Sequence, residues 1–149
     1  MTAMKNGNPI NIKLATTVVQ EGTEEKHNFD VAGFSVEKGG HTYLRYEETH
    51  QVEGNQLTVP VTIKLASDGM VHLTRTAAGQ RMKFVFSEVE PTMTHYATPY
   101  GMMPLVVKTI SMTRSIENEG TSGTLVVDYE LYQDEEKVGD YNLNLVFSK

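Results

Sequence analysis

The chain has 149 residues, which fits one domain spanning residues 1–149, because separate cores usually appear only beyond roughly 250 residues. Its formal net charge is −6 and its Lys and Arg residues are scattered, which disfavours nucleic-acid binding through clustered cations. There is no cysteine, so a disulfide scaffold, a thiolate metal site and a cysteine nucleophile are excluded.

The beginning of the chain carries one early lysine but lacks the continuous apolar region of a signal peptide. No segment approaches the ~18 consecutive apolar residues that a membrane-spanning helix needs. The sequence therefore predicts no membrane association, and a cytoplasmic location follows by default.

Apolar and polar residues alternate with a period of two along almost the whole chain, which is the pattern of half-buried β-strands. The alternation is clearest at residues 10–14, 57–65 and 82–86. Further strands are expected near residues 28–37, 41–50, 70–76, 92–98, 103–116, 123–133 and 139–148. No long segment has a helical apolar stripe, so the sequence predicts an all-β protein of about ten strands.

Short turn signals separate the predicted strands. Residues 38–40, 67–69 and 122–123 contain glycines that can supply positive φ, and residues 133–137 form a polar hairpin tip. Residues 20–26 are acidic and polar and are interpreted as a solvated loop. Connections this short favour antiparallel neighbours.

About ten antiparallel strands do not form a flat open sheet, because twist accumulates and exposed edges recruit other chains. An antiparallel meander that closes into a β-barrel of 8–10 strands is therefore predicted. Pro60 lies within a predicted strand and cannot donate a ladder hydrogen bond, so it indicates an edge, a bulge or a barrel corner.

The apolar members of the alternating sets are expected to be buried in this barrel. They are Ile12, Leu14, Leu44, Val61, Ile63, Leu73, Phe84, Phe86, Leu125, Val127, Tyr129, Leu143 and Leu145.

Three segments and one arginine carry a family resemblance: residues 43–48 (YLRYEE), Arg75, residues 96–101 (YATPYG) and residues 128–131 (DYEL). With these in order, the chain resembles the YwiB-like family of uncharacterised bacterial calycin-type β-barrels. The resemblance implies a lipocalin-like barrel and brings no established activity. The family pattern has a glycine two residues after the arginine, where this chain has Ala77, so a different hairpin is expected there.

Residues 93–103, MTHYATPYGMM, combine a histidine and two tyrosines with a turn signal. Thr98-Pro99-Tyr100-Gly101 matches a type I turn, which favours a structural hairpin. The alternative is that Tyr96 and Tyr100 form an amphipathic rim at the barrel mouth, each offering an apolar ring and a hydroxyl.

The sequence carries no motif of catalysis or metal binding. The five histidines lack metal-ligand spacing and are interpreted as solvated strand residues. A nucleophile elbow and a phosphate-binding glycine loop are both missing. No catalytic residue, metal or cofactor is therefore predicted, and the eight methionines are expected to fill the core in preference to lining a pocket.

Two opposite charges fall on the predicted inner face. If Leu44 and Tyr46 point inward, so does Glu48, and if Leu73 points inward, so does Arg75. A bulge or strand end could release both charges to solvent, because buried charges are rare unless partnered. The sharper prediction is an inward pair near one end of the barrel, beside Tyr46. By the same parity, Asp128 and Glu130 should point outward.

These features lead to two principal hypotheses of function. The first is a non-enzymatic barrel that binds a small apolar or amphipathic ligand at its mouth, with Arg75, Glu48, Tyr46, Tyr96 and Tyr100 as candidate binding residues. The second is a homo-oligomeric structural or interaction protein with a filled barrel, suggested by apolar residues on both faces at 106–107 and 126–127. An enzyme ranks third.

Overall fold

The computed structural model describes residues 7–77, 80–98 and 101–149. Within these ranges, the regular structure consists of ten strands and one 3-10 turn. The strands are β1 (Asn8–Gln20), β2 (Thr23–Lys38), β3 (His41–Val52), β4 (Asn55–Leu65), β5 (Val71–Ala77), β6 (Gln80–Phe86), β7 (Thr92–Thr98), β8 (Gly101–Glu117), β9 (Ser122–Gln133) and β10 (Glu136–Ser148), and the 3-10 turn is η2 (Asn118–Gly120).

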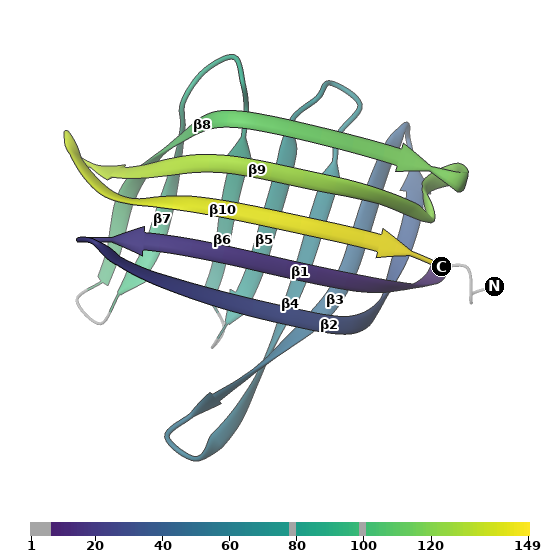
Figure 1. The fold of residues 1–149 in the computed structure, drawn as a ribbon, viewed down its shortest axis with the longest axis horizontal. Helices are drawn as coiled ribbons and strands as arrows, with labels where there is room; N and C mark the ends of the chain where they lie inside the picture. The colour runs from purple at the N-terminus through teal and green to yellow at the C-terminus, as the bar shows by residue number, and fades with distance from the viewer. Residues whose placement is uncertain (1–6, 78–79, 99–100) are drawn as a thin grey trace.

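All ten strands belong to one antiparallel sheet in the order β6-β5-β4-β3-β2-β1-β10-β9-β8-β7. The first and last strands of the chain pair with each other, and the sheet curls so that β6 and β7 approach (Figure 1). The result is a nearly closed barrel, which confirms the predicted all-β meander. The predicted strand count and the positions of the strands are also correct.

Among the residues that the structure describes, side-chain hydrogen bonds and no backbone ladder join β6 to β7 at the seam between them. Thr92 Oγ1 donates to the carbonyl oxygen of Val85 over 2.6 Å, and Thr94 Oγ1 donates to the carbonyl oxygen of Lys83. Threonine hydroxyls on β7 thus provide donors for two backbone carbonyl groups of β6.

The inner face alternates as the sequence predicts. Of the thirteen residues expected in the core, eleven are buried, whereas Phe84 and Tyr129 are half-buried. The fully buried side chains gather toward one end of the barrel, where Phe86, Phe147, Leu65 and Val71 meet. Phe84 and Tyr129 lie nearer the other end, where the interior is not filled.

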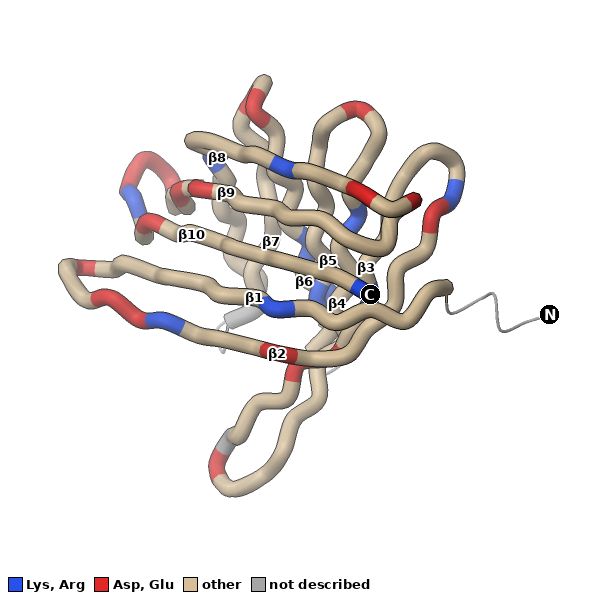
Figure 2. The backbone as a smooth tube through the Cα atoms, turned by 45° about the vertical axis from the view of Figure 1, so that its right-hand side comes forward, with Lys and Arg blue, Asp and Glu red and all other residues tan. Residues whose placement is uncertain are grey.

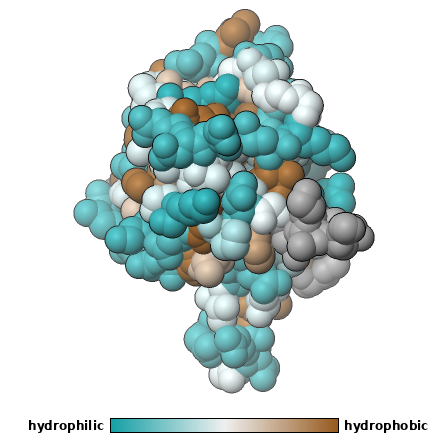
Figure 3. All heavy atoms as spheres, turned by 90° about the vertical axis from the view of Figure 1, so that its right-hand side faces the viewer, coloured by the Kyte–Doolittle hydropathy of each residue, from teal (hydrophilic) through white to brown (hydrophobic). Residues whose placement is uncertain are grey.

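That filled end carries the β2–β3, β4–β5, β6–β7 and β8–β9 turns, and is called the closed end here. The Ser35 hydroxyl donates to the carbonyl oxygen of Gly120 in η2, and Arg114 Nη2 donates to the carbonyl oxygen of Ala66. These bonds hold the β8–β9 connection and a β8 side chain over the core. Figure 3 faces this end and shows mostly polar residues, with apolar ones in small separate areas.

Two turn predictions were wrong. Residues 20–26 are not a loop, because β1 and β2 continue to a two-residue turn at Glu21 and Gly22, both with positive φ. Residues 122–123 are not a turn, because the reversal occurs in η2, where Asn118, Glu119 and Gly120 have positive φ. Gly123 instead lies within β9, at a close approach to β8 and Phe147.

The β3–β4 hairpin projects beyond the barrel (Figure 1). Among the described residues, strand β5 pairs with β4 from Val61 to Leu65, so Pro60 lies just outside this ladder. Pro60 therefore occupies a local edge, as its missing N–H group predicts. Among the described residues, no helix is long and apolar enough to cross a membrane.

Candidate ligand-binding site

The half of the barrel away from the closed end holds a cavity of about 690 Å³. Its lining includes Gln20, His50 and Gln133, which lie next to the β1–β2, β3–β4 and β9–β10 turns. The cavity therefore opens at the end that carries these turns, which is called the mouth here. Most of the wall is apolar and comes from inward positions such as Leu73, Phe84 and Leu105.

The register of three neighbouring strands places the predicted charged pair inside this cavity. Val61 on β4 pairs with Tyr46 on β3 and with Arg75 on β5, so the three side chains share one layer of the barrel. Glu48 follows Tyr46 on the same face, one layer nearer the mouth. Both Glu48 and Arg75 line the cavity.

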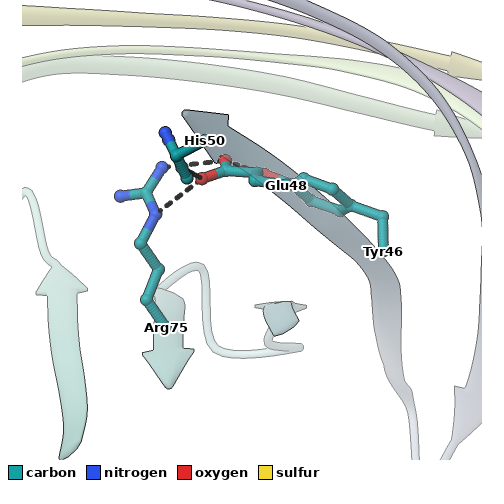
Figure 4. A network of polar contacts seen from close by, with 4 residues as sticks. All are labelled: Tyr46, Glu48, His50 and Arg75. Carbon is teal, nitrogen blue, oxygen red and sulfur yellow. Dashed lines mark hydrogen bonds and ion pairs between the residues drawn. The ribbon is translucent and has the colours of Figure 1, made fainter. Parts of the chain in front are cut away.

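The Glu48 carboxylate is 1% exposed and is contacted by Arg75, Tyr46 and His50 (Figure 4). Its Oε1 lies 3.2 Å from Arg75 Nε and 3.3 Å from His50 Nε2, and its Oε2 lies 3.0 Å from Arg75 Nη2 and 3.2 Å from the Tyr46 hydroxyl. The prediction that Arg75 and Glu48 pair directly, beside Tyr46, is confirmed. A buried carboxylate with two guanidinium bonds is a strong charge-assisted pair.

Burial and the charge of Glu48 together set the protonation states of Tyr46 and Arg75. Burial, together with the negative charge of Glu48, raises the pKa of Tyr46 far above its usual value. Burial alone would lower the pKa of Arg75, but its hydrogen bonds to Glu48 and the Glu48 charge outweigh burial and raise it. Tyr46 is therefore a neutral donor, and Arg75 a permanent cation.

Aromatic rings form the opposite wall. Tyr129 on β9 stacks on Tyr141 of β10 with ring centroids 5.1 Å apart, and it packs against Phe84 and Phe86 of β6. Burial raises the pKa of Tyr129, and the positive charge of Arg75 partly opposes that rise. The phenol of Tyr129 thus lies within electrostatic reach of the guanidinium.

Of the remaining candidates, Tyr96 lines the cavity from β7 and is 40% exposed, whereas Tyr100 lies outside the described residues. The prediction of a tight turn at residues 98–101 falls partly outside them too, although Thr98 and Gly101 do pair across the β7–β8 hairpin. Asp128 and Glu130 flank Tyr129 on β9, and Asp128 accepts from Ser111 and Asn142.

Two cavity residues were missed at the sequence level. His50 was interpreted as a solvated histidine, but it is half-buried and contacts Glu48; its position two residues after Glu48 was a usable signal. Tyr141 pairs with Tyr129 across the β9–β10 hairpin, which no local motif reveals. The predicted preference of methionines for the core is wrong for Met93 and Met102, which are 64% and 51% exposed.

Acidic residues lie on two of the hairpins at the mouth. The β1–β2 hairpin carries Glu21, Glu24 and Glu25 near its turn, and the β9–β10 turn carries a run of acidic residues at 134–136 (Figure 2). Within the described part of the chain, no group of three or more His, Asp or Glu residues is arranged to hold a metal ion.

Comparison with known proteins agrees with this architecture. The chain is 25% identical over 144 residues to the "Uncharacterized beta-barrel protein YwiB" of Bacillus subtilis (strain 168), covering 97% of this chain and 96% of that protein. The crystal structure of the ywiB protein from Bacillus subtilis superposes with a TM-score of 0.77 at 22% identity, covering 95% of this chain and 91% of that one. The family model described as "Domain of unknown function (DUF1934)" matches residues 12–145. The YwiB-like resemblance is thus confirmed, and the chain belongs to the DUF1934 family.

Proposed function

We propose that this protein is a non-enzymatic carrier or sensor that binds a small amphipathic ligand in the mouth half of its barrel. The observation that supports the proposal best is the cavity itself, which places a buried polar cluster in an apolar wall. Ligand pockets in proteins typically have volumes of about 300–1,000 Å³ and combine apolar walls with a few fixed polar groups.

The polar cluster gives such a ligand its orientation. Arg75 and Tyr129 lie below the mouth, whereas Tyr96, Met103 and Leu57 lie along the way to it. A ligand would therefore place its polar end against Arg75 and its apolar body against the wall. Tyr46 supports the site indirectly, because its hydroxyl is bonded to Glu48.

Native mass spectrometry of protein purified without denaturation, combined with titration of the neutral dye Nile red, tests this function. Ala77 lines the cavity, so Ala77→Phe should fill space and weaken Nile red binding at least about tenfold. Ala32→Phe is the matched control, since Ala32 is exposed on β2. Absence of both co-purified ligand and dye binding, or equal binding by the two variants, would refute the proposal.

The rival hypothesis, a homo-oligomer with a filled barrel, predicts a packed interior, whereas the mouth half contains a cavity. The second part of the rival hypothesis, that copies of the chain associate through an outer face of the barrel, stays a prediction. Met93, Met102 and Ile110 are exposed apolar residues on β7 and β8 that would favour it. Light scattering over a wide concentration range decides: a strict monomer counts against this hypothesis.

A further inference from the structure

We infer that the ligand of this cavity is uncharged and that its polar end accepts hydrogen bonds, as the carbonyl group of an ester or ketone does. The inference rests on the proposed function and names the chemical class of the ligand. Two observations support it: the hydrogen-bond donors and acceptors that remain available to a ligand deep in the cavity, and the balance of charge around these groups.

The hydrogen-bond acceptors of the ion pair, the two carboxylate oxygens of Glu48, already have partners within the protein. Each oxygen of Glu48 has two contacts, from Arg75 and His50 at Oε1 and from Arg75 and Tyr46 at Oε2. With 1% exposure, this carboxylate offers a ligand very little free surface, although Glu48 lines the cavity. A ligand that must donate hydrogen bonds, or that carries a positive charge, therefore finds no acceptor there and meets the guanidinium instead.

Some hydrogen-bond donors beside the ion pair, in contrast, remain available to a ligand. Arg75 uses Nε and Nη2 on Glu48, and among the described residues its Nη1 has no hydrogen-bond partner. Figure 4 shows the outer nitrogen of the guanidinium pointing away from Glu48. The hydroxyl of Tyr129 also has no partner within the described part of the chain, although the residue lines the cavity. Both residues line the cavity and both groups can donate a hydrogen bond, so a ligand that brings an acceptor matches them.

The charge balance argues against an anion as that acceptor. Glu48 already neutralises Arg75, so a bound carboxylate or phosphate would leave an uncompensated negative charge in a largely apolar cavity, which is costly. Displacement of Glu48 by the anion would create the same problem, because the buried carboxylate would lose its partners. The acidic residues at the mouth and the net charge of −6 further repel anions.

The test compares three probes with chains of similar length: methyl decanoate, sodium decanoate and decylammonium chloride. The apparent affinity of each probe is measured by its displacement of Nile red at pH 8. This affinity is then divided by the probe's water–octanol partition coefficient, so that differences in hydrophobicity are removed. On that scale the ester should bind at least tenfold more tightly than either ion. Tighter binding of decanoate or decylammonium would overturn the inference while leaving ligand binding intact.

A pair of variants tests whether the Tyr129 hydroxyl donates a hydrogen bond to the ligand. Tyr129→Phe should weaken methyl decanoate binding about five- to tenfold, the worth of one hydrogen bond, without loss of thermal stability. Tyr132→Phe is the matched control, because the Tyr132 hydroxyl donates to Glu130 on the same strand, and Tyr132 does not line the cavity. Equal ester binding by both variants would contradict the inference. Failure of the wild type to bind Nile red or any probe would instead refute the proposed function, and this inference with it.

Discussion

At the scale of single residues, the energetics of the site depend on a carboxylate that water barely reaches. Glu48 is 1% exposed and Arg75 is 29% exposed, so neither charge is strongly screened by solvent. A buried ion pair adds little net stability by itself, but removal of one partner leaves an uncompensated charge. The pair therefore contributes mainly a polar group held at a fixed position in the cavity wall.

The first prediction concerns this pair. Arg75→Met should lower the free energy of unfolding by about 3–5 kcal/mol, because it leaves the Glu48 carboxylate buried without its cation. The double variant Arg75→Met, Glu48→Gln should recover part of that loss, since the charge is then removed as well. Urea denaturation of Arg75→Met, Glu48→Gln and the double variant measures this coupling. Additive effects near zero would mean that both groups are solvated.

The second prediction concerns pH. Burial raises the folded-state pKa of Tyr46 above the ordinary value of 10.0, so the unfolded chain loses this proton first as pH rises. The folded state then binds more protons, and stability is fully present below pH 10 and falls above it, by up to about 1.4 kcal/mol per pH unit. Tyr46→Phe should reduce this slope in urea titrations between about pH 9 and pH 11. An unchanged slope would show that Tyr46 ionises equally in both states.

The charged pair could be predicted because strand parity is a strict geometric rule. Glu48 shares a face with Leu44, and Arg75 shares a face with Leu73, and all four side chains point inward in the structure. Parity does not say which strands face each other across a barrel. Tyr129 was predicted to point inward, but its place opposite Arg75 depends on the closure of the sheet.

At the scale of elements, the seam between β6 and β7 is the weakest part of the barrel wall. These two strands lack a backbone ladder between them among the described residues, and threonine hydroxyls of β7 provide the cross-links. A wall held in this way opens at lower cost than one held by a ladder, and the cavity is lined by Met82 and Tyr96 from these same strands.

The third prediction follows from the seam. Thr94→Val keeps the shape of the side chain but leaves the carbonyl of Lys83 without its donor, at a cost of about 1–3 kcal/mol. Hydrogen exchange measured by mass spectrometry should accelerate in β6 and β7 and stay unchanged in β1 and β10. Thr113→Val, at an exposed position of β8, is the control. Equal exchange in the two variants would show that the seam does not depend on Thr94.

The fourth prediction concerns a glycine that the sequence pattern assigned to a turn. A Cβ on Gly123 would lie 2.2 Å from the carbonyl oxygen of Ser115 and 2.9 Å from Phe147 Cζ. Gly123→Ala should therefore cost about 1–3 kcal/mol or more through overpacking. Gly54→Ala should cost only about 1 kcal/mol, since Gly54 has positive φ but open space around it. Thermal unfolding measures both, and equal losses would contradict the close approach.

Turn positions were harder to predict than strands for a physical reason. Residues 118–120 and 122–123 both contain a glycine beside small or polar residues, so local chemistry allows a reversal at either place. The register between β8 and β9 decides, and register is a property of the whole sheet. The β1–β2 turn was misplaced because the solvent-exposed ends of these strands carry no apolar alternation.

At the scale of the whole molecule, the interior is divided into a packed half and a hollow half. The closed end is filled by large apolar residues such as Phe86 and Phe147, whereas the mouth half keeps a cavity of about 690 Å³. The all-β barrel itself could be predicted from alternation and strand count. The hollow could not, because it depends on how far apart opposite walls stand, which sequence alternation does not encode.

An NMR titration of isotope-labelled protein with methyl decanoate shows whether this hollow binds a neutral amphipathic ligand. We expect saturable backbone shifts centred on the cavity strands, at Glu48, Arg75 and Tyr129, with little change at Lys13 and Thr113 on the outer face. Shifts confined to the outer face, or no shifts up to the solubility limit of the ester, would contradict it.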